Sequence, residues 1–171
     1  MNIVLIGYRG TGKSVVGKLI SERLRMECIS MDEKIVEKAG MSIPDIVENH
    51  GWATFRDMES EVVQELAKRD NIIIDTGGGV IERPENIDVL KANAFIVWLK
   101  ASAGAIVSRI EDGTERPSLT GEKSFIDEVA DVLEKRAPKY MSASHYEVDT
   151  EQLFPEQVAD RIINILRCNI G

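Results

Sequence analysis

The sequence predicts a three-layer α/β/α fold around a central parallel sheet of five strands. Short apolar runs alternate with longer amphipathic stretches along the whole chain, a pattern typical of parallel sheets that carry helices on both faces. The first apolar run leads directly into a glycine-rich turn at residues 7–14. With 171 residues and no internal repeat or linker, the chain is expected to form one domain, 1–171.

The expected strands are the short apolar runs, because strands buried on both faces of a parallel sheet are apolar throughout. They cover residues 3–6, 28–31, 72–74, 95–99 and 146–149. Gly7, Asp32 and Asp75 directly follow the first three strands. Since ligands of such folds bind at the carboxyl ends of the strands, we expect the site at this edge of the sheet.

The expected helices are the stretches in which apolar residues recur every three or four positions. They cover residues 13–25, 33–39, 42–50, 54–69, 84–92, 103–110, 125–140 and 155–167. Gly40 is expected to cap one helix and Gly51 to break another, and Pro138 should interrupt or end the helix at 125–140. The polar stretch that begins at Glu111 is expected to be a mobile loop.

Composition excludes several classes of partner. The net charge of −8 argues against non-specific nucleic-acid binding. No apolar run reaches the roughly 20 residues that span a bilayer, and Met1 lies too close to the first strand for a signal peptide. Cys28 and Cys168 lack metal-ligand or redox spacing, so both are expected to be free thiols. We expect a cytoplasmic monomer without nucleic-acid or membrane partners.

The glycine-rich turn, Gly-Tyr-Arg-Gly-Thr-Gly-Lys-Ser at residues 7–14, has the spacing and the strand–turn–helix context of a nucleoside-triphosphate site. Its backbone N–H groups and the N-terminus of the following helix are predicted to hold the phosphates of ATP. Lys13 would reach the β- and γ-phosphates, and the Ser14 hydroxyl would be a ligand of Mg²⁺. The predicted ATP-binding residues of this segment are Gly10, Thr11, Gly12, Lys13, Ser14 and Val15.

Two charged residues near this edge have two interpretations each. Asp32 either caps the helix predicted from residue 33, or accepts a proton from a substrate hydroxyl beside the γ-phosphate. Arg56 either forms a surface ion pair with Glu59 on the next helical turn, or grips a substrate carboxylate while Glu59 holds it in place. The sequence leaves both questions open.

Glycines and further arginines complete the candidate site. Gly77, Gly78 and Gly79 follow a buried strand, and close approach of a ligand to their backbone explains three glycines better than a plain turn does. Arg109 and Arg116 flank a polar segment, where an arginine is either solvated or closes on the transferring phosphate as part of a lid.

Taken together, these motifs resemble the shikimate kinase family, which belongs to the P-loop nucleoside-monophosphate-kinase-like group. The resemblance extends over nearly the whole chain. It rests on the phosphate-binding turn, on Ser42-Ile43 through Gly51 to Phe55-Arg56 and Glu59, on Gly77-Gly78-Gly79, on Arg116-Pro117, on Lys135-Arg136-Ala137-Pro138 with Tyr140, on Val148-Asp149-Thr150 and on Pro155.

The resemblance implies ATP- and Mg²⁺-dependent phosphorylation of the 3-hydroxyl of shikimate, with residues 33–60 as a substrate-binding subdomain and 111–123 as a mobile lid. It implies that Lys13, Asp32 and Arg116 are catalytic and that Arg109 lies against the adenine. The shikimate-binding residues that it implies are Asp32, Arg56, Gly77, Gly78, Gly79 and Arg136. A related kinase for gluconate or another hydroxy acid, and a non-catalytic nucleotide sensor, are the alternatives.

Three positions depart from the family pattern. The family usually has Asp-Thr-Asp where this chain has Ser30-Met31-Asp32, so a carboxylate that assists magnesium is absent. Asp75 lies where the family often has no acidic residue, and we hypothesise that it takes over this role at the metal. Alternatively, Asp75 only hydrogen-bonds the turn at 77–79. Trp52 stands where the family commonly has Glu, and it is expected either to pack on the substrate-binding subdomain or to reshape the pocket.

Overall fold

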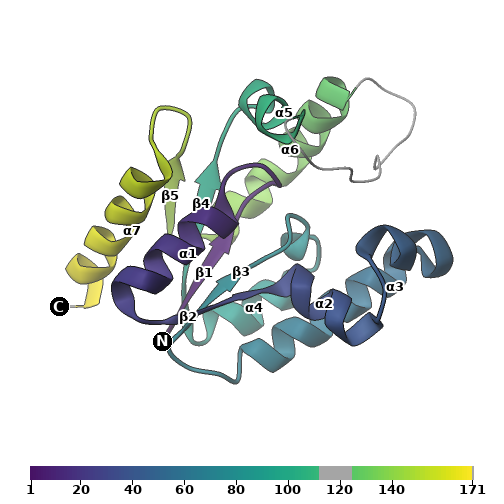
Figure 1. The fold of residues 1–171 in the computed structure, drawn as a ribbon, viewed down its shortest axis with the longest axis horizontal. Coiled ribbons are helices and arrows are strands. Elements are labelled where there is room, and N and C mark those ends of the chain that lie inside the picture. The colour runs from purple at the N-terminus through teal and green to yellow at the C-terminus, as the bar shows by residue number, and fades with distance from the viewer. Residues whose placement is uncertain (112–124, 171) are drawn as a thin grey trace.

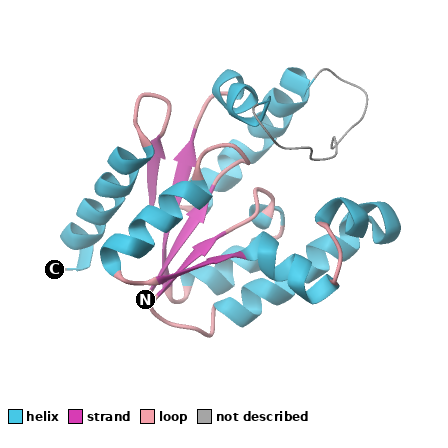
Figure 2. Ribbon diagram, in the orientation of Figure 1, coloured by secondary structure: helices cyan, strands magenta, loops and turns pink. Residues whose placement is uncertain are grey.

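The computed structural model describes residues 1–111 and 125–170. Its centre is a parallel sheet of five strands in the order β2-β3-β1-β4-β5 (Figure 1, Figure 2). The strands are β1 (Asn2–Ile6), β2 (Glu27–Ser30), β3 (Ile72–Asp75), β4 (Ala94–Lys100) and β5 (Tyr146–Asp149). Every neighbouring pair in this order runs parallel, so the predicted fold class is confirmed.

Helices cover both faces of the sheet (Figure 1). They are α1 (Lys13–Leu24), α2 (Met31–Ala39), α3 (Ile43–Leu66), α4 (Pro84–Lys91), α5 (Ala103–Glu111), α6 (Phe125–Ala143) and α7 (Pro155–Ile170), with a 3-10 helix, η1 (Val80–Glu82), after β3. The predicted lid, 111–123, falls almost entirely on residues 112–124, which lie outside the described part of the chain. It therefore stays a prediction.

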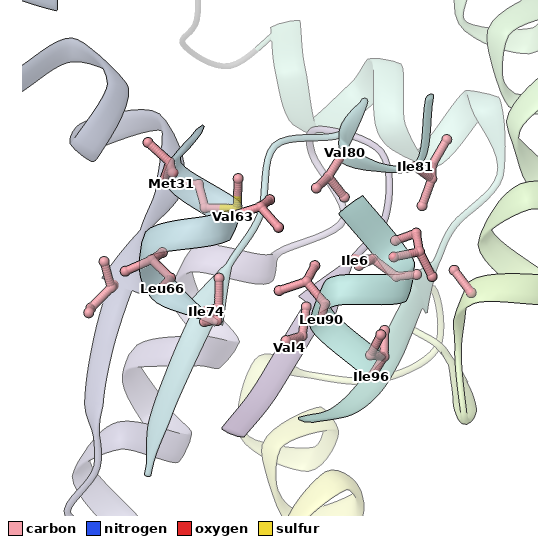
Figure 3. Packing of buried hydrophobic residues seen from close by; sticks show 14 of the residues in the cluster. Val4, Ile6, Met31, Val63, Leu66, Ile74, Val80, Ile81, Leu90 and Ile96 are labelled. Atoms are coloured by element: carbon pink, nitrogen blue, oxygen red, sulfur yellow. The ribbon is translucent and has the colours of Figure 1, made fainter. Parts of the chain in front are cut away.

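Each face of the sheet has its own hydrophobic core, because alternate side chains of a strand point to opposite faces. Ile3 and Leu5 of β1 belong to a core that α1 and α7 complete. Val4 and Ile6 belong to a second core, which α2, α3, α4 and α6 complete. Figure 3 shows this second core from close by. The three layers predicted from the sequence follow directly from this alternation.

Helix α3 bends sharply at Gly51, which has φ 84 and ψ 166 inside an otherwise helical element. Only glycine adopts such a positive φ readily, so the predicted break is a kink. Figure 1 shows α2 and the N-terminal part of α3 beyond the β2 edge of the sheet. The predicted substrate-binding subdomain, 33–60, covers α2 from its third residue onward and α3 as far as Ser60.

Helix α6 continues through Pro138 to Ala143, so the predicted interruption or end near this proline is wrong. A proline inside a helix costs about 3 kcal/mol. The turn that follows is nevertheless fixed by tertiary contacts. Tyr140 is fully buried and stacks on Trp98 with ring centroids 5.5 Å apart, and its hydroxyl donates a hydrogen bond to the Gly78 carbonyl. These contacts offset the local cost of the proline.

Two findings concern membrane-spanning helices and the state of the cysteines. Within residues 1–111 and 125–170, no helix is long and apolar enough to cross a bilayer. Cys28 and Cys168 are both free thiols, as predicted; Cys28 is half-buried and Cys168 is exposed.

Helix α1 approaches the sheet closely at Gly17, where a Cβ atom would lie only 2.9 Å from Cys28 Sγ. We therefore expect Gly17→Ala to destabilise the fold by about 1–3 kcal/mol, because an overpacked core forces its neighbours to shift. In an exposed helix the same change would stabilise by about 1 kcal/mol. Urea unfolding measures the difference. In a Cys28→Ala background the loss should shrink, and an equal loss in both backgrounds would contradict the packing argument.

The pairing of β4 with the chain around β5 includes His145. Its backbone N–H donates to the Ile96 carbonyl at 2.8 Å, and its Nδ1 accepts a hydrogen bond from the Ile96 N–H at 3.0 Å. The ring also stacks on Phe95, with centroids 5.4 Å apart. Burial, together with the charge of Lys91, lowers the pKa of His145 below its ordinary value. The folded state therefore requires the neutral imidazole, since a protonated Nδ1 cannot accept a bond.

This arrangement predicts a loss of stability in acid. His145 binds a proton more readily in the unfolded chain than in the folded chain. Its contribution to the free energy of unfolding is therefore complete above pH 6.5 and declines as the pH falls through the lowered pKa. His145→Asn keeps an acceptor at this position that does not titrate. Urea midpoints between about pH 5 and 7 should fall less in this variant than in the wild type. Equal declines would show that His145 is not the titrating group.

Candidate functional site

The phosphate loop, residues 7–14, joins the end of β1 to the start of α1 (Figure 1). Gly12 is the N-cap residue of α1 and has φ 92 and ψ 17, a left-handed conformation that glycine adopts without strain. At Gly7, a Cβ would lie 2.5 Å from the Leu99 carbonyl oxygen, so a side chain has no room. The first N–H groups of α1 lack intrahelical acceptors. Such groups form an anion site at a helix N-terminus.

Lys13 is buried within this loop. Its Nζ donates hydrogen bonds to the carbonyl oxygens of Gly7 at 2.7 Å and Tyr8 at 3.0 Å. The Thr11 hydroxyl also donates to the Tyr8 carbonyl, at 2.9 Å. The ammonium group is thereby held against the turn whose backbone would surround the phosphates. Of the predicted ATP-binding residues in this segment, Val15 is half exposed at 53%.

Ser14 and Asp75 lie side by side at the base of the loop. The Ser14 hydroxyl donates a hydrogen bond of 2.6 Å to Asp75 Oδ2, and Asp75 is only 6% exposed. In the sheet, Asp75 is the register partner of both Leu5 on β1 and Ser30 on β2. The Asp75 carboxylate therefore lies one strand away from Ser30, the position at which the family usually has an Asp that assists magnesium.

The Ser14–Asp75 pair suits a magnesium ion. A hydroxyl and a carboxylate are hard oxygen donors, and Mg²⁺ characteristically takes one or two protein ligands together with water and phosphate oxygens. In the described ranges, no group of three or more His, Cys, Asp or Glu side chains could hold a metal by itself. A magnesium ion at this position would thus complete its coordination with the nucleotide and water.

Asp32 lies in the first turn of α2, which begins at Met31 and not at Glu33. The N-cap residue of the helix is Ser30, whose hydroxyl accepts a hydrogen bond from the Glu33 N–H at 3.3 Å. The interpretation of Asp32 as the helix cap is therefore wrong. Instead, its carboxylate lies beside the glycine turn: a Cβ on Gly77 would be 3.1 Å from Asp32 Oδ1.

The glycine turn at residues 77–79 brings two arginines to the same place. A Cβ on Gly79 would lie 2.3 Å from both Nη1 and Nη2 of Arg56, and one on Gly78 would lie 3.5 Å from Arg136 Nη1. The turn is thus surrounded by Asp32 from α2, Arg56 from α3 and Arg136 from α6. We call this arrangement the inner pocket. Gly79 has no room for a side chain because the Arg56 guanidinium packs against its α-carbon, and Gly77 is nearly as tightly packed against Glu59 and Asp32.

Arg56 is held by Glu59, one helical turn further along α3. The Arg56 Nη1 to Glu59 Oε1 distance is 2.9 Å, and Glu59 is only 1% exposed. Burial raises the pKa of Glu59, although the charge and hydrogen bond of Arg56 act in the opposite direction. Its second oxygen, Oε2, has no hydrogen-bond partner within the described residues and would be 3.0 Å from a Cβ on Gly77. The interpretation as a surface ion pair is wrong.

Arg136 is also held by a carboxylate. Its Nε donates to Glu82 Oε1 at 3.0 Å, and its guanidinium lies 5.7 Å from the centre of the Tyr8 ring. Lys139 Nζ donates to the other oxygen of Glu82 at 3.2 Å. Burial raises the pKa of Glu82, but Lys139 and Arg136 outweigh this effect and lower it overall. Glu82 is therefore an anion, and it holds the Arg136 guanidinium in place.

The phosphate loop and the inner pocket adjoin each other. A Cβ on Gly78 would lie 3.4 Å from the Arg9 backbone nitrogen and 3.6 Å from the Gly7 carbonyl oxygen, both in the loop. Arg109 also contacts the loop, because its Nη1 donates to the Gly10 carbonyl at 3.3 Å and to the Thr150 hydroxyl at 3.0 Å. The predicted residue Arg116 lies outside the described residues.

A cleft of about 520 Å³ borders the inner pocket. We call it the outer cleft. Its lining residues are Trp52, Arg56, Glu82, Arg83, Val132, Lys135, Arg136 and Lys139. Sequence reasoning did not assign a role to Glu82 from η1 or to Lys135 and Lys139 from α6. They are far apart in the sequence from Trp52 and Arg56, and only the fold brings them together.

Comparisons with known proteins identify the family of this chain. A family model described as shikimate kinase matches residues 9–167. A shikimate kinase of Caldicellulosiruptor bescii is 40% identical, over 96% of this chain and 94% of its own length. One from Thermodesulfovibrio yellowstonii is 41% identical, over 95% and 92%. The structure of shikimate kinase from Acinetobacter baumannii in complex with shikimate has a TM-score of 0.93 and 33% identity, over 98% of this chain and 93% of that chain. This chain therefore belongs to the shikimate kinase family.

Proposed function

We propose that this protein transfers the γ-phosphate of ATP to the 3-hydroxyl of shikimate, giving shikimate 3-phosphate and ADP. The observation that carries the proposal is the inner pocket, where Asp32 and the paired arginines Arg56 and Arg136 meet around one glycine turn beside the phosphate loop. A ring that carries a carboxylate at one end and hydroxyls at the other matches this distribution of charge. A solved relative that shares 33% identity is described as a complex with shikimate.

The two arginines would fix the substrate. A carboxylate can receive parallel hydrogen bonds from a guanidinium group, and both guanidinium groups are already oriented by buried or half-buried carboxylates, Glu59 and Glu82. Such preorganisation reduces the entropy lost on binding. With its carboxylate held at Arg56 and Arg136, the substrate would present its hydroxyls to the other side of the turn at Gly77.

Asp32 would act on the reacting hydroxyl. Its carboxylate would accept a hydrogen bond from the 3-hydroxyl, orient the oxygen toward the γ-phosphorus and take the proton as the new P–O bond forms and the bond to the leaving ADP breaks. Lys13 and the N–H groups of residues 10–15 would stabilise the negative charge on the phosphates. Arg116 is proposed to add positive charge there from the lid, and Arg109 to border the adenine.

We propose that Ser14 and Asp75 hold Mg²⁺. Mg²⁺ neutralises the charge that develops on the β- and γ-phosphate oxygens during transfer. The Ser14 hydroxyl would be a direct ligand, and the Asp75 carboxylate would bind the ion or one of its waters. Because Ser30 caps α2 and has no carboxylate, Asp75 on the neighbouring strand would supply the negative charge.

The assignment is tested by ADP release in the presence of shikimate, of gluconate and of no acceptor. We expect ATP turnover that depends on shikimate, because a rigid ring acid holds its carboxylate and hydroxyls at opposite ends, as the arginines and Asp32 of the inner pocket require. Release with gluconate instead of shikimate would indicate a kinase for another hydroxy acid. If nucleotide binds but no acceptor accelerates ADP release, the protein is a nucleotide sensor and the proposal is wrong.

The magnesium role predicts a specific defect in Asp75→Asn. Loss of a carboxylate next to a metal typically weakens metal affinity by about 10–100-fold. We expect the Mg²⁺ concentration that gives half-maximal binding of a non-hydrolysable ATP analogue, measured by calorimetry, to rise by at least about ten-fold. Asp88→Asn, at an exposed position of α4, is the matched control and should titrate like the wild type. An unchanged titration in Asp75→Asn would show that this residue serves only the fold.

A further inference from the structure

The outer cleft concentrates positive charge in an acidic protein. The chain has a formal net charge of −8, yet the lining of the cleft contains five cationic side chains and one carboxylate, Glu82. The cationic residues are Arg56, Arg83, Lys135, Arg136 and Lys139. Charges of one sign that line a cleft focus the electrostatic field and raise the local concentration of oppositely charged ligands.

The cleft and the inner pocket share a boundary. Arg56 and Arg136 belong to both, and Arg136 faces each of them. Its Nε is bonded to Glu82, which lines the outer cleft, whereas its Nη1 lies against Gly78 in the inner pocket. An anion that enters the outer cleft therefore meets the same guanidinium group that would bind the substrate carboxylate.

Fold stability does not explain these cations. Lys139 reaches Glu82 at 3.2 Å and is 48% exposed, and Arg83 reaches Asp57 at 2.7 Å and is 36% exposed. Exposed pairs of this kind contribute about 0–1 kcal/mol. Lys135 forms no ion pair with the residues that the structure describes. One carboxylate, Glu82, is thus shared by two cations, and Lys135 adds a further positive charge beside them.

We propose that the outer cleft is a capture site for the carboxylate of the incoming substrate. Lys135 and Lys139 attract the anion and hold it loosely, and Arg136 and Arg56 then receive it in the inner pocket. The indole of Trp52, which also lines the cleft, offers an apolar surface to the carbon ring of a small cyclic acid. The inference rests on the proposed function, because it takes shikimate as the captured anion.

The test measures kcat/KM for shikimate as a function of ionic strength, from about 0.01 to about 0.5 M, a range over which the screening length falls from about 30 Å to a few ångströms. At low salt, the double variant Lys135→Gln/Lys139→Gln should lose about five-fold in kcat/KM, because two unit charges within several ångströms of the anion are removed. The salt dependence should flatten correspondingly. The turnover number at saturating shikimate should change less than kcat/KM, since capture does not limit it.

Two further variants separate capture from other effects. Lys135→Arg/Lys139→Arg keeps both charges and should retain the salt dependence of the wild type. Lys68→Gln/Arg167→Gln removes two exposed cations outside the cleft and gives the same net charge; it should also behave like the wild type. Thermal unfolding confirms that each variant is folded before its kinetics are compared.

The outcomes distinguish this inference from the proposed function. If the wild type phosphorylates shikimate but Lys135→Gln/Lys139→Gln has the kcat/KM and salt dependence of the Lys68/Arg167 control, capture by the outer cleft is wrong and the proposed function stands. If the wild type does not phosphorylate shikimate, both fall. A flattened salt dependence in the glutamine variant alone supports the inference.

Discussion

The site depends on the packing of the Arg56 guanidinium against the α-carbon of Gly79, where even a methyl group would lie 2.3 Å from two of its nitrogens. This contact brings the second half of α3 onto the turn that follows β3. From there, Glu59 is buried beneath the turn, and Asp32 from α2 and Arg136 from α6 reach its other glycines. A turn without side chains thus allows three helices to share one point at the edge of the sheet.

Charges in this region are arranged as shared pairs. Glu59 holds Arg56 on one side, and Glu82 holds Arg136 on the other. Two cationic groups of the same site are thereby kept at fixed positions, although they would repel each other if left to themselves. Glu59 bears most of the desolvation, which is why its pKa is raised while that of Glu82 is lowered. Each carboxylate therefore holds one arginine in a fixed position from which it can bind a further anion, such as a substrate carboxylate.

Features that are local in the sequence were predictable, and features that depend on tertiary contacts were not. The phosphate loop and the five strands follow from spacing and apolar runs alone. The spacing of Arg56 and Glu59 predicts that they meet, but it contains no information on the burial of Glu59. Likewise, α2 is capped by the Ser30 hydroxyl and not by Asp32. The contacts of the buried Tyr140 allow α6 to continue through Pro138. The outer cleft draws on segments far apart in the chain, and the roles of Arg116 and the lid remain predictions.

Glu82 has a consequence for how this enzyme can evolve. The same carboxylate binds Arg136, which borders the inner pocket, and Lys139, which borders only the outer cleft. A change at Glu82 would therefore alter the orientation of one cation and release the charge of the other at the same time. If the outer cleft captures the substrate as proposed, a substitution at Glu82 affects both substrate binding and substrate approach, whereas a substitution at Lys135 affects approach alone.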